Sequence, residues 1–142
     1  MPDADQLRQA YKNVIAAVEA DDADALAARI SPHIVDHSGI PDQPPGAAGV
    51  IAWMHGMHES LSGLRGVVED IVVEGDRVAA RMTWTGTHTG SLVGLPATGK
   101  HVTLPAMHLL RFEDGVAAEW WGVPDLYGAL VGLGVTFELP PT

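Results

Sequence analysis

The segment His101–Gly122, HVTLPAMHLLRFEDGVAAEWWG, decides the fold. Two runs with alternating side chains flank Asp114-Gly115, and an Asp-Gly pair between such runs is a strong signal for a β-hairpin. Side chains of a strand point alternately to its two faces. The first run therefore predicts one shared face made of Val102, Leu104, Ala106, His108, Leu110 and Phe112. The second run predicts a shared face made of Val116, Ala118, Trp120 and Gly122.

His108 is the polar exception on this apolar face. A titratable group on an apolar surface needs a partner, a place on a pocket wall or a chemical role. One interpretation is a pocket base, or a hydrogen-bond donor to a substrate carbonyl, because a neutral imidazole can do either near pH 7. The other is a core histidine that is satisfied by a neighbouring backbone group.

Apolar residues recur at helical spacing in three segments before most of the strands. They predict helices around Leu7–Val18, Leu26–Ile30 and Val50–Leu61, the first of them capped by Asp3 or Asp5. Strands are expected at His33–His37, at Val67–Glu74 and from Val78 to about Thr85, and Pro124-Asp125 starts a short last helix. This order predicts an α+β fold in which three helices cover one face of a curved, mostly antiparallel sheet.

Length and composition narrow the class of protein. A chain of 142 residues is expected to form one domain, spanning 1–142. The net charge of −10 disfavours a nucleic-acid partner, and the absence of cysteine excludes disulfides. No apolar run reaches membrane-spanning length and no signal peptide is visible, so we expect a cytoplasmic protein without a membrane partner.

Three further groups are candidates for chemistry. Adjacent residues of a strand point to opposite faces, so either His37 or Asp36 faces a pocket. His88 lies in a loop rich in Gly and Thr, either at a pocket rim or as a hydrogen-bonding loop residue. Asp125 is the remaining carboxylate near the hairpin, and a helix cap is its more ordinary role.

His55 and His58 are three residues apart on the third expected helix. This spacing can bring two imidazoles to one metal ion, but neither an HExxH pattern nor a set of adjacent carboxylates supports a site. We therefore predict no metal. The loop Ser38–Gly49, rich in Pro and Gly, is long for a compact domain, and loops of this kind often form lids or pocket rims.

Several stretches together resemble the SnoaL-like polyketide cyclases of the nuclear transport factor 2-like superfamily. They are VDH at 35–37, GDRVAARMTWTGTHTG at 75–90, GLPATGK at 94–100, HLLRFEDG at 108–115 and the closing PDLYGALVGLG. The resemblance implies a cone-shaped fold with a deep apolar pocket, a homodimer joined through the sheet, and acid/base chemistry without a cofactor. The implied pocket wall consists of Tyr11, Trp53, Met57, Met82, Trp84, Ala106 and Trp120.

In the cyclases that this chain resembles, a carboxylate on the last strand moves the proton. Alignment on His108 and on Pro124-Asp125 places Gly122 at that position, so the expected carboxylate is missing. By the same resemblance, His108 and His88 match recurrent histidines of the family, and His37, His88 or Asp125 would be the partner of His108.

Two functions remain open at this stage. The first is a cyclase-like or isomerase-like enzyme that acts on a hydrophobic, carbonyl-bearing, polyketide-like small molecule. The second is a module that binds a hydrophobic ligand, or another protein, without catalysis, and Gly122 favours it.

Overall fold

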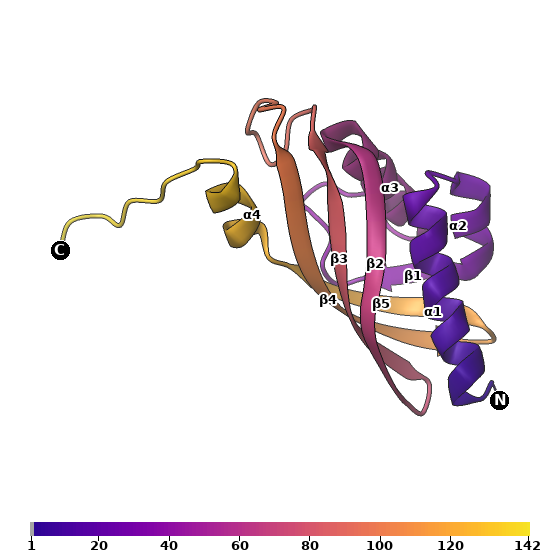
Figure 1. Cartoon of the computed structure of the whole chain (residues 1–142). Helices are drawn as coiled ribbons and strands as arrows, with labels where there is room; N and C mark the ends of the chain where they lie inside the picture. Colours follow the sequence, from indigo (N-terminus) through magenta and orange to yellow (C-terminus); the bar gives the residue numbers. More distant parts are fainter. Residues whose placement is uncertain (1) are drawn as a thin grey trace.

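The structure is a computed structural model, and it describes residues 2–142. Nine elements follow one another: α1 (Ala4–Glu19), α2 (Ala23–Arg29), β1 (Ile30–Asp36), α3 (Ala47–Ser60), β2 (Leu61–Glu74), β3 (Arg77–His88), β4 (His101–Glu113), β5 (Val116–Pro124) and α4 (Leu126–Gly132). The first three helices lie together on one side of a curved sheet, and α4 leads into an extended C-terminal segment (Figure 1). The predicted α+β fold is thus confirmed.

The strands form one sheet in the order β1-β5-β4-β3-β2. Strands β2 to β5 pair in antiparallel fashion, whereas β1 joins the edge parallel to β5. The hairpin turn is confirmed, since Asp114 and Gly115 both have positive φ, as a tight two-residue hairpin turn requires. The long hairpin therefore occupies the middle of the sheet and supports the inner face.

The prediction of which side chains face inward is confirmed for β4 and is wrong for the start of β5. Along β4 the even-numbered residues from Val102 to Phe112 are buried. A register shift between Arg111 and Phe112 leaves Ala118 without a register partner, because Arg111 pairs with Glu119 and Phe112 with Ala117. This bulge turns Ala117 inward in place of Ala118 and keeps Trp120 on the inner face.

Helix α1 begins at a complete capping box. The Asp3 side chain accepts the Gln6 N–H, and the Gln6 side chain accepts the Asp3 N–H. Its buried stripe includes Tyr11, Val14 and Val18, so the helix packs its apolar face on the sheet. Tyr11 is fully enclosed as a result.

Two boundaries differ from the sequence-based expectation. Helix α3 passes directly into β2 at Leu61, whereas the strand was expected to begin at Val67, because the inward side chains of Leu61 and Leu64 extend the apolar face of the strand. Strand β1 begins at Ile30, immediately after α2, because Ile30 pairs with Ala117 and is buried. Within the described part of the chain, no helix is long and apolar enough to cross a membrane.

Candidate functional site

Tyr11 and His108 form a polar contact inside the largely apolar interior. The Tyr11 hydroxyl lies 2.9 Å from Nδ1 of His108, and both side chains are buried. Helix α1 supplies the first and the middle of β4 supplies the second. His108 therefore has a side-chain partner and not the backbone partner expected of an ordinary core histidine.

Burial determines the charge state of this pair. Desolvation lowers the pKa of His108 to about 4, although the charge of Asp36 opposes this shift. Desolvation also raises the pKa of the Tyr11 phenol far above its usual value. Near neutral pH both groups are consequently uncharged.

The pairing assigns the tautomer of His108. The phenol O–H of Tyr11 has His108 as its partner, so it is satisfied only if it donates to Nδ1. A neutral imidazole that accepts at Nδ1 carries its proton at Nε2. The Nε2–H group of His108 has no hydrogen-bond partner among the described residues. Nε2 is also not among the unpaired atoms of these residues that are completely shielded from solvent. It is available to a carbonyl oxygen.

A row of aromatic rings in contact with one another extends from His108. The His108 and Trp120 rings lie 5.0 Å apart, Trp120 and Trp53 5.6 Å, and Trp53 and Trp84 6.1 Å, all in edge-to-face arrangements. The other residues of the predicted pocket wall, Met57, Met82 and Ala106, are buried in the same core cluster. The structure thus brings together the residues that were predicted to line one pocket.

Gly122 lies directly opposite His108 on β5. An added Cβ there would lie 3.1 Å from Trp120 Nε1, 3.3 Å from His108 Cδ2 and 3.4 Å from Ser38 Oγ. Three side chains with polar atoms therefore close over the glycine, and Cδ2 is the atom of the His108 ring that lies next to it. A side chain at position 122 would require the Trp120 and His108 rings to shift by a few tenths of an ångström.

The loop after β1 contributes a network that the sequence did not reveal. Ser38 Oγ accepts the Gly122 N–H at 2.9 Å and donates to Asp36 Oδ1 at 2.9 Å. Oδ1 also accepts the Ser38 N–H, and Oδ2 accepts the Gln43 amide at 3.0 Å. Asp36 is thereby tied to the residue that faces His108. The sequence could have indicated this network only through the alternation of side chains along β1, which places Asp36, and not His37, on the inner face of the sheet.

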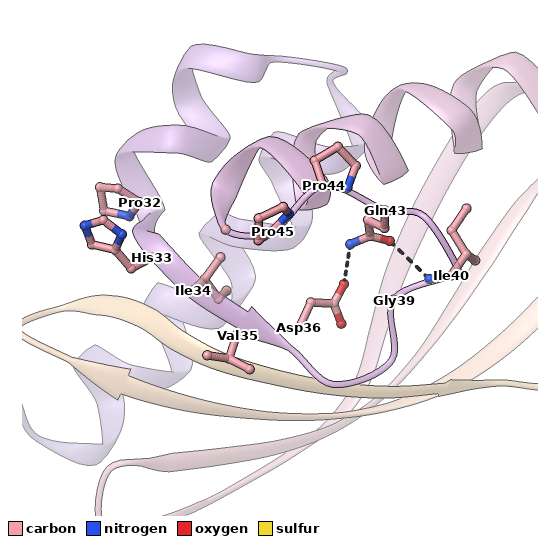
Figure 2. A pocket seen from close by; sticks show the side chains of 11 residues that line it. Pro32, His33, Ile34, Val35, Asp36, Gly39, Ile40, Gln43, Pro44 and Pro45 are labelled. Atoms are coloured by element: carbon pink, nitrogen blue, oxygen red, sulfur yellow. Dashed lines mark hydrogen bonds between the residues drawn. The ribbon is translucent and has the colours of Figure 1, made fainter.

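A hollow of about 460 Å³ opens between β1 and this loop. Figure 2 shows Asp36 and Gln43 pointing toward each other across it, with Ile34 and Pro45 on its walls. Its volume falls within the range of small-molecule sites, roughly 300–1,000 Å³. The predicted wall residues do not line this hollow, because their rings and methionines pack against one another in the core. Asp36 borders the hollow and is connected to the buried centre.

His37 lies on the opposite face of the sheet from His108. Its ring stacks on Trp121 at 4.3 Å, and its Nε2 lies 3.1 Å from Glu119 Oε1. Hydrogen bonds from Arg111 and His37 lower the pKa of Glu119. His37 is therefore not brought together with His108.

His88 is buried at the far end of β3. Its Nδ1 accepts the Thr98 N–H at 3.2 Å and lies 2.9 Å from the Thr98 hydroxyl, so it anchors the connection between β3 and β4. Ala80, and not His88, pairs with His108 in the register. Eight residues at about 3.3 Å each separate Ala80 from His88, which places the two histidines roughly 26 Å apart along the sheet.

The remaining candidates have local partners. Asp125 caps α4 by accepting the Gly128 N–H. His55 pairs with Asp21, and His58 contacts the Val18 carbonyl. Among residues 2–142, no group of three or more His, Asp or Glu side chains is arranged to hold a metal ion.

Comparisons with known proteins agree with this architecture. The profile of the family "SnoaL-like polyketide cyclase" matches residues 5–133. The chain is 29% identical to the aklanonic acid methyl ester cyclase DnrD of Streptomyces peucetius over 113 residues, which cover 78% of this chain and 75% of the relative. It is 30% identical to the nogalonic acid methyl ester cyclase of Streptomyces nogalater over 107 residues, covering 74% and 76%.

Solved structures share the fold over nearly the whole chain. TsrD from Streptomyces laurentii superposes with a TM-score of 0.87 at 28% identity, covering 94% of this chain and 98% of that one. The protein belongs to the SnoaL-like polyketide cyclase family and has its nuclear transport factor 2-like fold. The family's small molecules are polyketide-like.

Proposed function

We propose that the protein is an acid/base enzyme that cyclises or isomerises a hydrophobic, carbonyl-bearing, polyketide-like molecule. The observation that carries this proposal is the Tyr11–His108 pair, in which Nε2–H has no partner among the described residues and Cδ2 of the same ring lies next to Gly122. Family membership supports the substrate class, and the names of the matched relatives point to the methyl esters of aklanonic and nogalonic acid.

The proposed reaction needs only proton transfers and one new bond. A proton leaves the carbon next to one carbonyl, and the resulting enolate carbon attacks a second carbonyl of the same molecule. The new alkoxide then takes up a proton, so the product is an isomer of the substrate. Electrons balance within the molecule, and no oxidant, reductant or cofactor is consumed.

His108 is the electrophilic group in this scheme. Its Nε2–H donates to the carbonyl oxygen on which negative charge develops, and Tyr11 holds the ring in the donating tautomer. The apolar surroundings strengthen this hydrogen bond because they exclude water. A neutral imidazole donor remains neutral through the reaction, since its pKa near 4 lies well below the working pH.

A non-catalytic binding module is the second candidate. Gly122 supports it, because the strand position at which the cyclases carry their acid/base residue has no side chain here. In that case the same donors would orient a bound carbonyl compound without turning it over.

Incubation with aklanonic acid methyl ester and nogalonic acid methyl ester tests the proposal. Conversion to an isomer of equal mass, resolved by chromatography, is expected for the wild type. His108→Asn should lose at least tenfold in kcat, whereas His55→Asn, an exposed histidine of α3, should retain full activity. Quenching of tryptophan fluorescence by either ester, without any isomer formed, would favour the binding module.

We also propose that the chain forms a homodimer through the outer face of the sheet. Met107 and Val123 pair in the register there, with 55% and 72% of their surfaces exposed, and Val35 at the edge is half exposed. An exposed apolar face of this kind is typical of a protein–protein contact.

A further inference from the structure

The proposed reaction requires a proton acceptor, and the strand position that supplies it in the related cyclases is a glycine here. His108 is a poor acceptor, because its Nδ1 is occupied by Tyr11 and its Nε2 carries the proton. A second group close to the same point must therefore accept the proton that leaves the substrate.

Asp36 is the carboxylate that the sheet brings to this point. Its register partner on β5 is Trp120, and Gly122 lies one inward position further along the same strand. Strands β1, β5 and β4 are neighbours in this order, so Asp36 and His108 flank β5 from opposite sides. Two strand spacings of about 4.8 Å and an offset of two residues at about 3.3 Å each put their backbones roughly 12 Å apart. Gly122 itself adds no side chain there, and the Trp120 ring and the Ser38 hydroxyl lie next to it on the inner face.

We infer that Asp36 removes and returns the substrate proton, in place of the missing carboxylate on β5. This inference rests on the proposed function. A substrate carbonyl would accept from His108 Nε2–H on one side while Asp36 takes the proton from the adjacent carbon on the other. The proton then passes from Asp36 to the new alkoxide, which restores the carboxylate and balances the cycle.

The hydrogen bonds around Asp36 leave room for this role. An ionised carboxylate has about four acceptor sites. Two are used on Oδ1 by Ser38, and one is used on Oδ2 by Gln43. The last site, on Oδ2, is free among the described contacts, and Asp36 lines the hollow between β1 and its loop. Ser38 acts as a positioning residue, because it holds Asp36 against the Gly122 backbone.

Kinetics of single variants with aklanonic acid methyl ester test the inference. Asp36→Asn should lower kcat by about 10²–10⁴-fold, the usual contribution of a positioned acid/base group, and change KM by less than about threefold. Ser38→Ala should lower kcat by roughly tenfold, with KM also preserved. Asp42→Asn is the matched control, because Asp42 is exposed in the same loop and has positive φ, which Asn tolerates. It should match the wild type.

Asp36→Glu keeps the charge and moves the carboxylate by one methylene, so it serves if Asp36→Asn fails to fold, as judged by circular dichroism. A tenfold or larger loss in kcat at preserved KM is then expected. A kcat within about threefold of the wild type, in whichever of the two variants folds, overturns the role of Asp36 and leaves the proposed function intact. A wild type that does not convert the ester defeats the proposed function, and the inference falls with it.

Discussion

Tyr11 and His108 are 97 residues apart in the chain, yet their side chains meet at 2.9 Å in the interior. Among the hydrogen bonds of the described residues, this is the one that joins the first helix to the central hairpin. The contact orients one imidazole inside an apolar cluster, and burial in that cluster lowers the imidazole pKa so that the ring is neutral near pH 7. Its loss should be visible in stability, in acid sensitivity and in ligand binding.

Tyr11→Phe removes the hydroxyl and leaves Nδ1 of His108 without a partner in a buried setting. An unsatisfied buried polar atom costs about 1–3 kcal/mol, so the free energy of unfolding should fall by that amount. Urea denaturation monitored by tryptophan fluorescence measures it. Tyr127→Phe is the control, since Tyr127 is exposed on α4. If its free energy of unfolding fell by the same amount, the loss in Tyr11→Phe could not be assigned to the buried hydrogen bond.

The stability of the protein should decrease between about pH 6.5 and pH 4. The unfolded state binds a proton at His108 near pH 6.5, whereas burial delays the same event to about pH 4 in the folded state. Between these values the unfolded state binds more protons, so acid favours unfolding, by roughly 3 kcal/mol at the lower end. The free energy of unfolding, measured from pH 7 to pH 4, should fall less steeply for His108→Asn. Parallel curves would show that His108 is not the responsible group.

Gly122→Ala places a methyl group among Trp120, His108 and Ser38 at 3.1–3.4 Å. These neighbours must move by a few tenths of an ångström, so we expect a loss of about 1 kcal/mol in the free energy of unfolding. Gly132→Ala at the end of α4 meets no atom within 4 Å and should be neutral or slightly stabilising. Equal stability of both variants would mean that the cluster above Gly122 is loose.

Met107→Glu places a charge in the middle of the exposed outer face of the sheet. If this face joins two copies, burying an unpaired carboxylate should shift the protein to the monomer, as measured by light scattering after size exclusion. Leu139→Glu, in the exposed C-terminal segment, should leave the mass unchanged. A monomeric wild type would contradict the dimer.

The local patterns of the chain predicted the helical stripe of α1, the hairpin around Asp114-Gly115 and the inward position of His108, because these depend only on periodicity and turn chemistry. The inward residue at the start of β5 could not be predicted, since one bulge residue, Ala118, shifts the alternation there, and bulges leave no mark in the sequence pattern. The Gly- and Thr-rich sequence around His88 predicted either a pocket-rim residue or a hydrogen-bonding loop residue, and His88 accepts the Thr98 N–H.

The hydrogen bonds of Asp36 could not be predicted from the sequence, for a different reason. Asp36 and His37 are adjacent, so exactly one faces inward, and only pairing with Trp120 and Trp121 on β5 decides which. Ser38 and Gln43 lie in an irregular loop with no periodicity to read. Their bonds to Asp36 are local, but the bond from the Gly122 N–H to Ser38 joins residues more than eighty positions apart in the chain.

The most direct test of the central claim is the nitrogen NMR spectrum of the His108 imidazole at pH 7, recorded with and without aklanonic acid methyl ester. We predict a neutral ring with its proton on Nε2 and an acceptor signature at Nδ1. Saturation with the ester should shift Nε2 of His108 and leave the ring of His55 unchanged. A proton on Nδ1, a charged ring, or an Nε2 signal that does not respond to bound ester would contradict it.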